Sequence, residues 1–225
     1  MKRSCRDKSD RRKIFLVEDH PVTREGFAQL IDYQKDLQVC GQAGTAAQAL
    51  VGIDTSRPDL VIVGIILADS SGLDLIKDIH NRYPALPILV LSTHDESLYA
   101  ERALRAGARG YVMKLAPTSE VMRALRQVLK GELYLSETMR SRMVRKHLHG
   151  ASTDLASEMD ELTDRELEVF RLIGAGLTTR RIAGKLHLSQ STVETHGARI
   201  KQKLKVNDRM ELVRRAVEWE HRQRG

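Results

Sequence analysis

Five short apolar runs alternate with amphipathic stretches over the first part of the chain. The runs have the length and composition of buried strands, and they are Lys13–Val17, Leu37–Ala43, Leu60–Val63, Ile88–Ser92 and Gly110–Met113. Each is followed by helical spacing of apolar residues, and the predicted helices begin at Pro21, Thr45, Leu73, Ser97 and Pro117. Five alternating units predict a doubly wound α/β domain around a five-stranded parallel sheet.

The first predicted helix has one apolar face. Pro21 suits the first turn of a helix, and Val22, Phe27, Leu30 and Ile31 are predicted to form its apolar face.

From Leu162 onward the pattern is entirely helical. Thr163 and Glu166 have the spacing of a capping box that begins a helix, and Gly174 and Gly176 are predicted to end it. A second short helix follows, capped by Thr178 or Thr179. Ser189 caps a third, over residues 190–204, and a fourth carries Leu212 and Trp219. Two short helices joined by a tight turn predict a helix-turn-helix.

The third of these helices has two distinct faces. Val193, Gly197, Ile200 and Leu204 share one side and are predicted to face the core. The opposite side is polar, small at its centre and basic at its rim, and it comprises Ser191, Thr192, Thr195, Ala198, Arg199 and Gln202, flanked by Glu194, Lys201 and Lys203. Such a face can enter a DNA major groove, although a solvated amphipathic helix has the same pattern.

These patterns divide the chain into four parts. Residues 1–12 are predicted to be a disordered basic tail, 13–131 the α/β domain, 132–160 a partly helical linker and 161–225 the helix-turn-helix domain.

Charge separates the parts further. The net charge is +7, and residues 161–225 carry fourteen basic and nine acidic groups, whereas residues 14–160 carry sixteen and nineteen. A polyanion partner is therefore expected for the last third, with a solvated basic surface as the alternative. No apolar run is long enough to span a membrane. With only Cys5 and Cys40, a disulfide framework is not expected, and we predict a cytoplasmic protein.

The strand ends of the predicted sheet carry chemically active side chains. Glu18 and Asp19 follow the first strand, Ser92 ends the fourth and Lys114 follows the fifth, whereas Gly64 after the third has no functional group. Because carboxyl ends of parallel strands converge on one crevice, this set predicts a place for a metal ion and a phosphoryl group.

At this spacing, residues 13–130 resemble the receiver domain of bacterial two-component response regulators. The resemblance implies that the acidic pair and an aspartate ending the third strand hold Mg²⁺. It also implies that this aspartate accepts a phosphoryl group from a histidine kinase. Glu18, Asp19, Ser92 and Lys114 match the family pattern, as does Tyr111, whose counterpart changes rotamer on activation.

The acceptor position departs from that pattern. It lies eight residues before the loop glycine, Gly72, and is therefore Gly64, while the loop proline is replaced by Ala68. An acyl phosphate needs a carboxylate nucleophile, so we expect no aspartyl phosphate, no cofactor and weak or absent Mg²⁺ binding. Three alternatives remain: Asp69 as a displaced acceptor, another ligand held by Glu18, Asp19 or Lys114, or an engineered substitution at position 64.

Residues 160–220 resemble the LuxR-type DNA-binding domain, through Leu162-Thr163, Gly176-Leu177, Ile182-Ala183, Leu188-Ser189 and Thr192-Val193 with His196. Together with a receiver, this is similar to NarL/FixJ-type transcription regulators. The resemblance implies that the third helix reads bases and that its start and the preceding helix contact phosphates. The implied DNA-binding residues are Thr178, Thr179, Arg180, Ser189, Ser191, Thr192, Glu194, Thr195, His196, Ala198, Arg199, Lys201 and Lys203.

The expected function is that of a dimeric transcription regulator that binds paired half-sites on double-stranded DNA, independently of aspartyl phosphorylation. The missing acceptor argues against a histidine kinase partner, and RNA polymerase is a further candidate partner. The alternative is a pseudo-receiver adaptor that acts by protein binding. An enzyme is not expected, because the one crevice with converging polar groups lacks its nucleophile.

Overall fold

A computed structural model of the chain describes residues 11–67, 70–149, 159 and 161–224. The predicted disordered tail, residues 1–12, lies largely outside the described residues, as do residues 150–158 and 160 of the predicted linker at 132–160. The chain divides into two compact units: one comprises residues 1–96 and 103–136, and the other comprises residues 97–102 and 137–225. Within the described residues, no helix is both long and apolar enough to cross a membrane.

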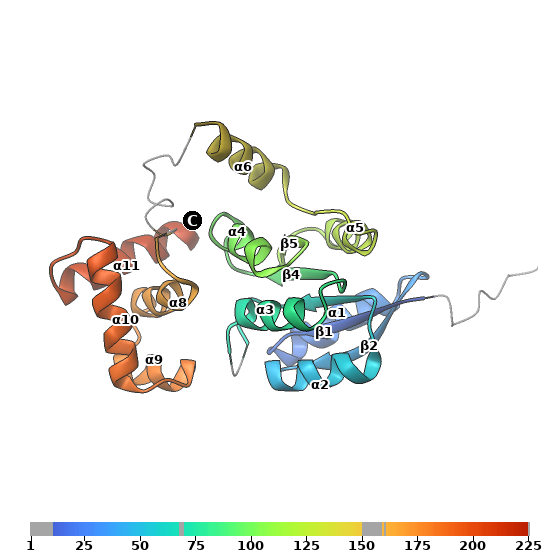
Figure 1. Cartoon of the computed structure of the whole chain (residues 1–225), viewed down its shortest axis with the longest axis horizontal. Helices are drawn as coiled ribbons and strands as arrows, with labels where there is room; N and C mark the ends of the chain where they lie inside the picture. The colour runs from blue at the N-terminus through green and yellow to red at the C-terminus, as the bar shows by residue number, and fades with distance from the viewer. Residues whose placement is uncertain (1–10, 68–69, 150–158, 160, 225) are drawn as a thin grey trace, which may run out of the picture. The chain divides into compact units, whose positions relative to one another are not determined.

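The first unit is a five-stranded parallel sheet flanked by helices (Figure 1). Its strands are β1 (Arg12–Val17), β2 (Leu37–Ala43), β3 (Leu60–Val63), β4 (Ile88–Ser92) and β5 (Gly110–Met113), in the order β2-β1-β3-β4-β5. Its helices are α1 (Pro21–Asp32), α2 (Ala46–Ser56), α3 (Gly72–Arg82), α4 (Glu96–Ala106) and α5 (Thr118–Leu129). The doubly wound fold is confirmed, with the strand order of flavodoxin-like domains.

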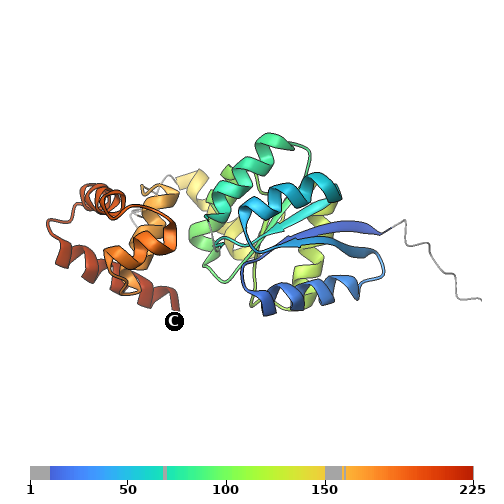
Figure 2. The same cartoon turned by 90° about the horizontal axis from the view of Figure 1, so that it is seen from below.

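The helices cover both faces of the sheet because the central strands are apolar on both sides. All four residues of β3 and all five of β4 are buried. Side chains of α1 and α5, among them Ile31 and Leu125, share one core with the strands. Figure 2 shows α1 (blue) on one face and α2 (cyan) on the other.

The predicted apolar face of α1 is wrong at two positions. Val22 is 85% exposed and Leu30 is 39% exposed, whereas Ala28 and Ile31 are buried and Phe27 packs against the core. The reason is helical geometry: Val22 precedes Ile31 by nine residues, which is about two and a half turns and therefore the opposite side of the helix.

The second unit is helical. It contains α6 (Glu137–His149), α8 (Asp164–Gly174), α9 (Thr179–Leu186), α10 (Gln190–Lys203) and α11 (Arg209–Arg224). The predicted capping box is confirmed, because Thr163 accepts from the Glu166 amide and the Glu166 side chain accepts from the Thr163 amide. Gly176 adopts a φ of 79° just after α8, where the chain reverses with the two backbone bonds of a Schellman motif.

Candidate functional site

Two groups of side chains are candidates for function. One lies at the strand ends of the sheet, and the other lies on the outward face of α10. The sheet register brings the first group together. Val17 pairs with Val63, Val63 with Val90, and Ser92 with Met113. The residues that follow these strands therefore meet at one edge, as the sequence predicted.

Glu18 and Lys114 form an ion pair at this edge. The Nζ atom of Lys114 lies 2.7 Å from Oε2 of Glu18, and the Glu18 side chain is only 4% exposed. The backbone amide of His20 donates to Oε1 of the same carboxylate at 3.3 Å. The Arg24 guanidinium donates to the Glu18 carbonyl oxygen at 2.7 Å. The buried carboxylate is thus compensated by groups of the chain itself, as a buried charge must be.

Gly64 lies directly against this pair. Its amide donates to the Val17 carbonyl oxygen at 2.9 Å, which holds the end of β3 to the end of β1. A Cβ atom built on Gly64 would lie 3.0 Å from Oε2 of Glu18. The Glu18 carboxylate therefore borders the space into which a side chain at position 64 would extend.

Gly72, at the start of α3, is required by close packing of the backbone. A Cβ atom there would lie 1.9 Å from the carbonyl oxygen of Gly64. The Gly72 amide also donates to the Ile65 carbonyl oxygen at 2.8 Å. The start of α3 thus packs against the backbone at the end of β3. Ala68 and Asp69, including the displaced acceptor considered above, lie outside the described residues.

Ser92 and Tyr111 both bind the backbone of His94. The Ser92 hydroxyl accepts from the His94 amide at 3.0 Å, and the Tyr111 hydroxyl donates to the His94 carbonyl oxygen at 2.7 Å. Both side chains are buried. Tyr111 is therefore in an inward position, held by the loop that follows β4.

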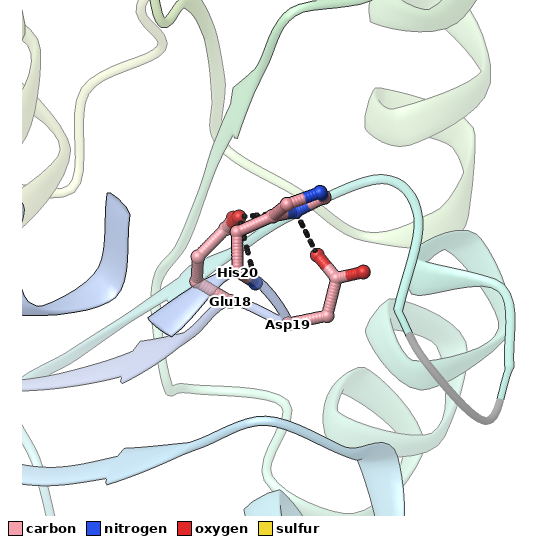
Figure 3. Close-up of side chains that lie close together, drawn as sticks. All are labelled: Glu18, Asp19 and His20. Atoms are coloured by element: carbon pink, nitrogen blue, oxygen red, sulfur yellow. Dashed lines mark hydrogen bonds and ion pairs between the residues drawn. The ribbon is translucent and has the colours of Figure 1, made fainter. Parts of the chain in front are cut away.

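His20 is a neighbour of the acidic pair that the sequence analysis did not single out (Figure 3). Its Nδ1 atom lies 2.7 Å from Oδ1 of Asp19 and 3.3 Å from Oε1 of Glu18. Its position next to two acids at a strand end was the signal that could have identified it. Ligand atoms of Glu18, Asp19 and His20 lie within 4.8 Å of one another, so these three residues could hold a divalent cation. An imidazole nitrogen suits a transition metal better than Mg²⁺, which prefers oxygen ligands.

The second group of residues depends on caps at the helix starts. The Thr178 hydroxyl caps α9, and the Ser189 hydroxyl accepts from the Thr192 amide at 3.0 Å to cap α10. Between the two helices, His187 adopts a φ of 52°, which reverses the chain at the end of α9. The predicted tight turn between two short helices is therefore present.

The outward face of α10 is exposed to solvent. Its exposed residues are Ser191, Glu194, Thr195, Ala198 and Arg199, with Thr192 and Lys201 partly exposed. The Thr195 hydroxyl donates to the Ser191 carbonyl oxygen at 2.9 Å. Among the described residues, neither Glu194 nor Arg199 has an ion-pair partner. Both charged groups are therefore available to another molecule.

Two predicted DNA-binding residues have contacts inside the domain. The Nζ atom of Lys203 lies 2.6 Å from Oε2 of Glu166, whose side chain is 3% exposed. Burial alone raises the pKa of Glu166, but Lys203 and the Thr163 amide and hydroxyl together hold that pKa below its usual value. The His196 ring is half-buried, and its buried Nδ1 atom has no hydrogen-bond partner in the described part of the chain. Burial lowers the pKa of His196.

Helix α9 carries two further residues that were predicted to bind DNA. Thr179 accepts a hydrogen bond from the Arg209 guanidinium at 3.1 Å, while Arg180 is exposed. Val193, Ile200 and Leu204 are buried, as predicted for the core face of α10. Gly197, on the same face, is only partly covered.

Two family models match the chain. Residues 14–126 match the response regulator receiver domain, and residues 160–216 match the luxR family of bacterial regulatory proteins. The oxygen regulatory protein NreC of Staphylococcus aureus is 34% identical over 209 residues, which are 91% of this chain and 96% of NreC.

Solved structures extend the comparison. A LuxR-family two-component response regulator from Aurantimonas sp. SI85-9A1 is 29% identical, with a TM-score of 0.58 over 62% of this chain and 99% of that one. RcsB from Salmonella enterica serovar Typhimurium, solved on a promoter with the phosphomimetic BeF3⁻, has a TM-score of 0.66 at 22% identity. It covers 91% of this chain and 98% of its own, and at that identity it shows the fold alone.

Proposed function

The chain belongs to the LuxR family of response regulators, and from this we propose that it is a dimeric transcription regulator whose receiver works without an aspartyl phosphate. Membership of the family makes it a DNA-binding transcription regulator. The dimer, the residues that touch DNA and the independence from phosphate are the proposal.

The outward face of α10 supports the choice of DNA-contacting residues. Ala198 and Thr195 keep the centre of this face small, so a helix can approach base edges without a bulky side chain. Arg199 is exposed and without an ion-pair partner among the described residues, which suits it to a phosphate or a guanine. The other proposed contacts are Thr178, Thr179, Arg180, Ser189, Ser191, Thr192, Glu194 and Lys201. The sequence also predicted His196 and Lys203 as contacts.

Lys203 and His196 are the weakest members of that set on physical grounds. Lys203 already neutralises the buried carboxylate of Glu166, so a phosphate would have to compete with an ion pair inside the domain. His196 is half-buried. We propose that these two residues position α10, and that the exposed residues before and between them meet the DNA.

A dimer follows from the size of the module. One helix-turn-helix domain of four short helices buries little DNA surface, and such domains reach high affinity by reading paired half-sites with two copies. RcsB is described as dimers on DNA, and we propose the same stoichiometry for this chain.

The ion pair between Glu18 and Lys114 is the observation that carries phosphate independence. In a phosphorylated receiver the lysine would bind a phosphoryl oxygen, but here it lies 2.7 Å from Glu18, next to a glycine that offers no nucleophile. We propose that Gly64 stands at the acceptor position and that the pair holds the receiver in one state. A histidine kinase then finds no carboxylate at position 64 to accept its phosphoryl group, and Mg²⁺ has lost one oxygen ligand.

Intact-mass spectrometry tests the receiver part of the proposal. The full chain is treated with acetyl phosphate and with phosphoramidate in the presence of Mg²⁺, and the mass is expected to stay unchanged. A base-labile adduct of about 80 Da, the mass of one phosphoryl group in an acyl linkage to an aspartate, would overturn phosphate independence. Because Asp69 could carry such an adduct, the variant Asp69→Asn is the matched control.

Salt-dependent DNA binding tests the output part. Binding to mixed double-stranded DNA is expected to weaken steeply with salt, since each neutralised phosphate releases counterions. An adaptor that acts through proteins would bind DNA weakly at low salt and show little salt dependence. That result would favour the adaptor and overturn the DNA-contact residues proposed above.

A further inference from the structure

A cavity of about 380 Å³ lies in the helical unit, lined by residues of α8, α9, α10 and α11. Its lining is mainly apolar and includes Ile173, Leu177, Ile182, Val193, Leu212 and Val213. Pockets of about 300–1,000 Å³ with mostly apolar walls and a few polar groups are typical of small-molecule sites. The cavity lies in the helical unit, away in sequence from the strand ends described above, and the proposed function assigns no small-molecule ligand to it.

Gly197 leaves part of this space unfilled. It lines the cavity from α10, and a Cβ atom built on it would meet no atom within 4 Å. Its backbone is helical, so a larger residue could stand there without strain. A glycine inside a helix is less favourable than an alanine, and a larger side chain at this position would fill apolar space. Local stability therefore does not explain the glycine.

Two of the three charged residues that line the cavity are cationic. Lys201 and Arg209 contribute to its lining, and both are at least partly exposed, so their charges lie toward solvent. Thr179 fixes the Arg209 guanidinium through a hydrogen bond of 3.1 Å. Within the described part of the chain, no carboxylate forms an ion pair with either residue. Glu194 is the single acidic residue of the lining, so the charged rim carries one net positive charge.

We propose that this cavity binds a small amphipathic acid. The apolar body would lie against Ile182, Val193 and Leu212 in the space left by Gly197. The carboxylate would lie between Lys201 and Arg209. Apolar burial supplies most of the affinity in such a site, whereas the two cations select an anionic head over a neutral or basic one.

Ligand and DNA would then compete or cooperate, because five residues belong to both surfaces. The residues that line the cavity and are also among the proposed DNA contacts are Thr178, Thr179, Glu194, Ala198 and Lys201. A ligand in this cavity would regulate the DNA-binding domain directly, in a protein whose receiver is proposed not to be regulated by an aspartyl phosphate. This coupling rests on the proposed function, whereas ligand binding itself does not.

Calorimetry on the full chain with decanoate as the probe tests the site, at concentrations below those at which decanoate forms micelles. Decanoate is expected to bind more tightly than decanol and much more tightly than decylamine. The variant Gly197→Leu fills the cavity and is expected to weaken decanoate binding at least tenfold, about 1.4 kcal/mol. Gly184→Leu is the matched control, because Gly184 is an exposed helical glycine outside the lining, also with open space around its Cβ position.

Each outcome decides the proposal. Loss of binding in Gly197→Leu with retention in Gly184→Leu supports it, provided that both variants keep the helical circular dichroism of the wild type. No binding of decanoate to the wild type, or equal binding by Gly197→Leu, overturns it. Lys201→Gln is expected to weaken decanoate about two- to fivefold, the size of one exposed ion pair, without changing decanol binding. An equal loss for both probes overturns the assignment of the head group.

A DNA-binding titration with and without decanoate separates this proposal from the proposed function. If decanoate binds but leaves DNA affinity unchanged, the cavity is a ligand site and the coupling is wrong. If the chain binds no DNA, the proposed DNA contacts fail while calorimetry still decides the cavity.

Discussion

Lys114 and Glu18 stand at opposite ends of the first unit's sequence, yet the Lys114 ammonium lies 2.7 Å from the Glu18 carboxylate. The strand register brings them together, because β1 and β5 both end at the same edge of the sheet. Their side chains are 15% and 4% exposed, respectively. The buried carboxylate of Glu18 is therefore neutralised by the more exposed ammonium of Lys114.

Removing Lys114 is expected to destabilise the fold. Lys114→Ala leaves the Glu18 carboxylate buried without its cation, which costs about 3 kcal/mol when one partner of a buried pair is lost. Urea unfolding measures the change in free energy. Lys77→Ala is the control, since the exposed pair of Lys77 with Asp74 contributes at most about 0.5 kcal/mol. Equal losses in the two variants would contradict a structural role for the Lys114 pair.

An aspartate at position 64 is expected to make the first unit sensitive to Mg²⁺. Gly64→Asp places a second carboxylate beside Glu18, where a Cβ atom would already lie 3.0 Å from Oε2. Like charges this close are expected to reduce stability by about 1–2 kcal/mol. Mg²⁺ should restore stability by binding the folded state, and thermal unfolding with and without Mg²⁺ measures this.

Gly64→Asn is the control for that experiment, because it adds the same volume without the charge and should show no response to Mg²⁺. A wild-type chain that Mg²⁺ stabilises as strongly as Gly64→Asp would mean that Glu18, Asp19 and His20 already form a sufficient cation site.

Replacing Arg199 by alanine is expected to affect DNA binding, whereas replacing Lys203 by alanine is expected to affect stability. Arg199→Ala should weaken DNA binding and lower the salt dependence by about one counterion, with unchanged stability. Lys203→Ala should lose stability, because the buried Glu166 carboxylate loses its cation. Fluorescence anisotropy on DNA across salt concentrations, together with urea unfolding, separates the two effects. A salt dependence lowered by about one counterion in a stable Lys203→Ala would place Lys203 on the DNA instead.

His196 is expected to make stability depend on pH. Burial is the main cause that lowers its pKa, and Arg165 and Arg199 lower it further while Glu166 opposes them. The unfolded chain then takes up a proton near pH 6.5 while the folded chain stays neutral. Stability is therefore complete above about pH 6.5 and falls as the pH drops toward the folded pKa.

Urea unfolding of the wild type and of His196→Gln at several pH values between about 7.5 and 5 covers this window. The variant should lose less stability on acidification than the wild type. The exposed His80 provides the control His80→Gln, which should keep the wild-type slope. An unchanged slope in His196→Gln would assign the pH dependence to other groups.

Much of the fold could be predicted from local sequence. β3, β4 and β5 have the bounds predicted from their apolar runs, because a strand buried on both faces needs an unbroken apolar segment. Thr163, Thr178 and Ser189 cap the predicted helices, because hydroxyls at these positions satisfy backbone amides a few residues away. Both signals act within a few residues, so the sequence alone contains them.

Only the tertiary structure decided which side chains contact each other when they lie far apart in the sequence. The sequence placed Lys203 on the rim of a DNA-binding face, but the packing of α10 against α8 joins it to Glu166. It placed Gly197 on a core face, yet only the positions of α9 and α11 leave an open cavity beside it. Periodicity tells which side of a helix is covered and not what covers it. The Glu18 and Lys114 pair was predictable as a meeting of strand ends, because parallel topology fixes which edge they share.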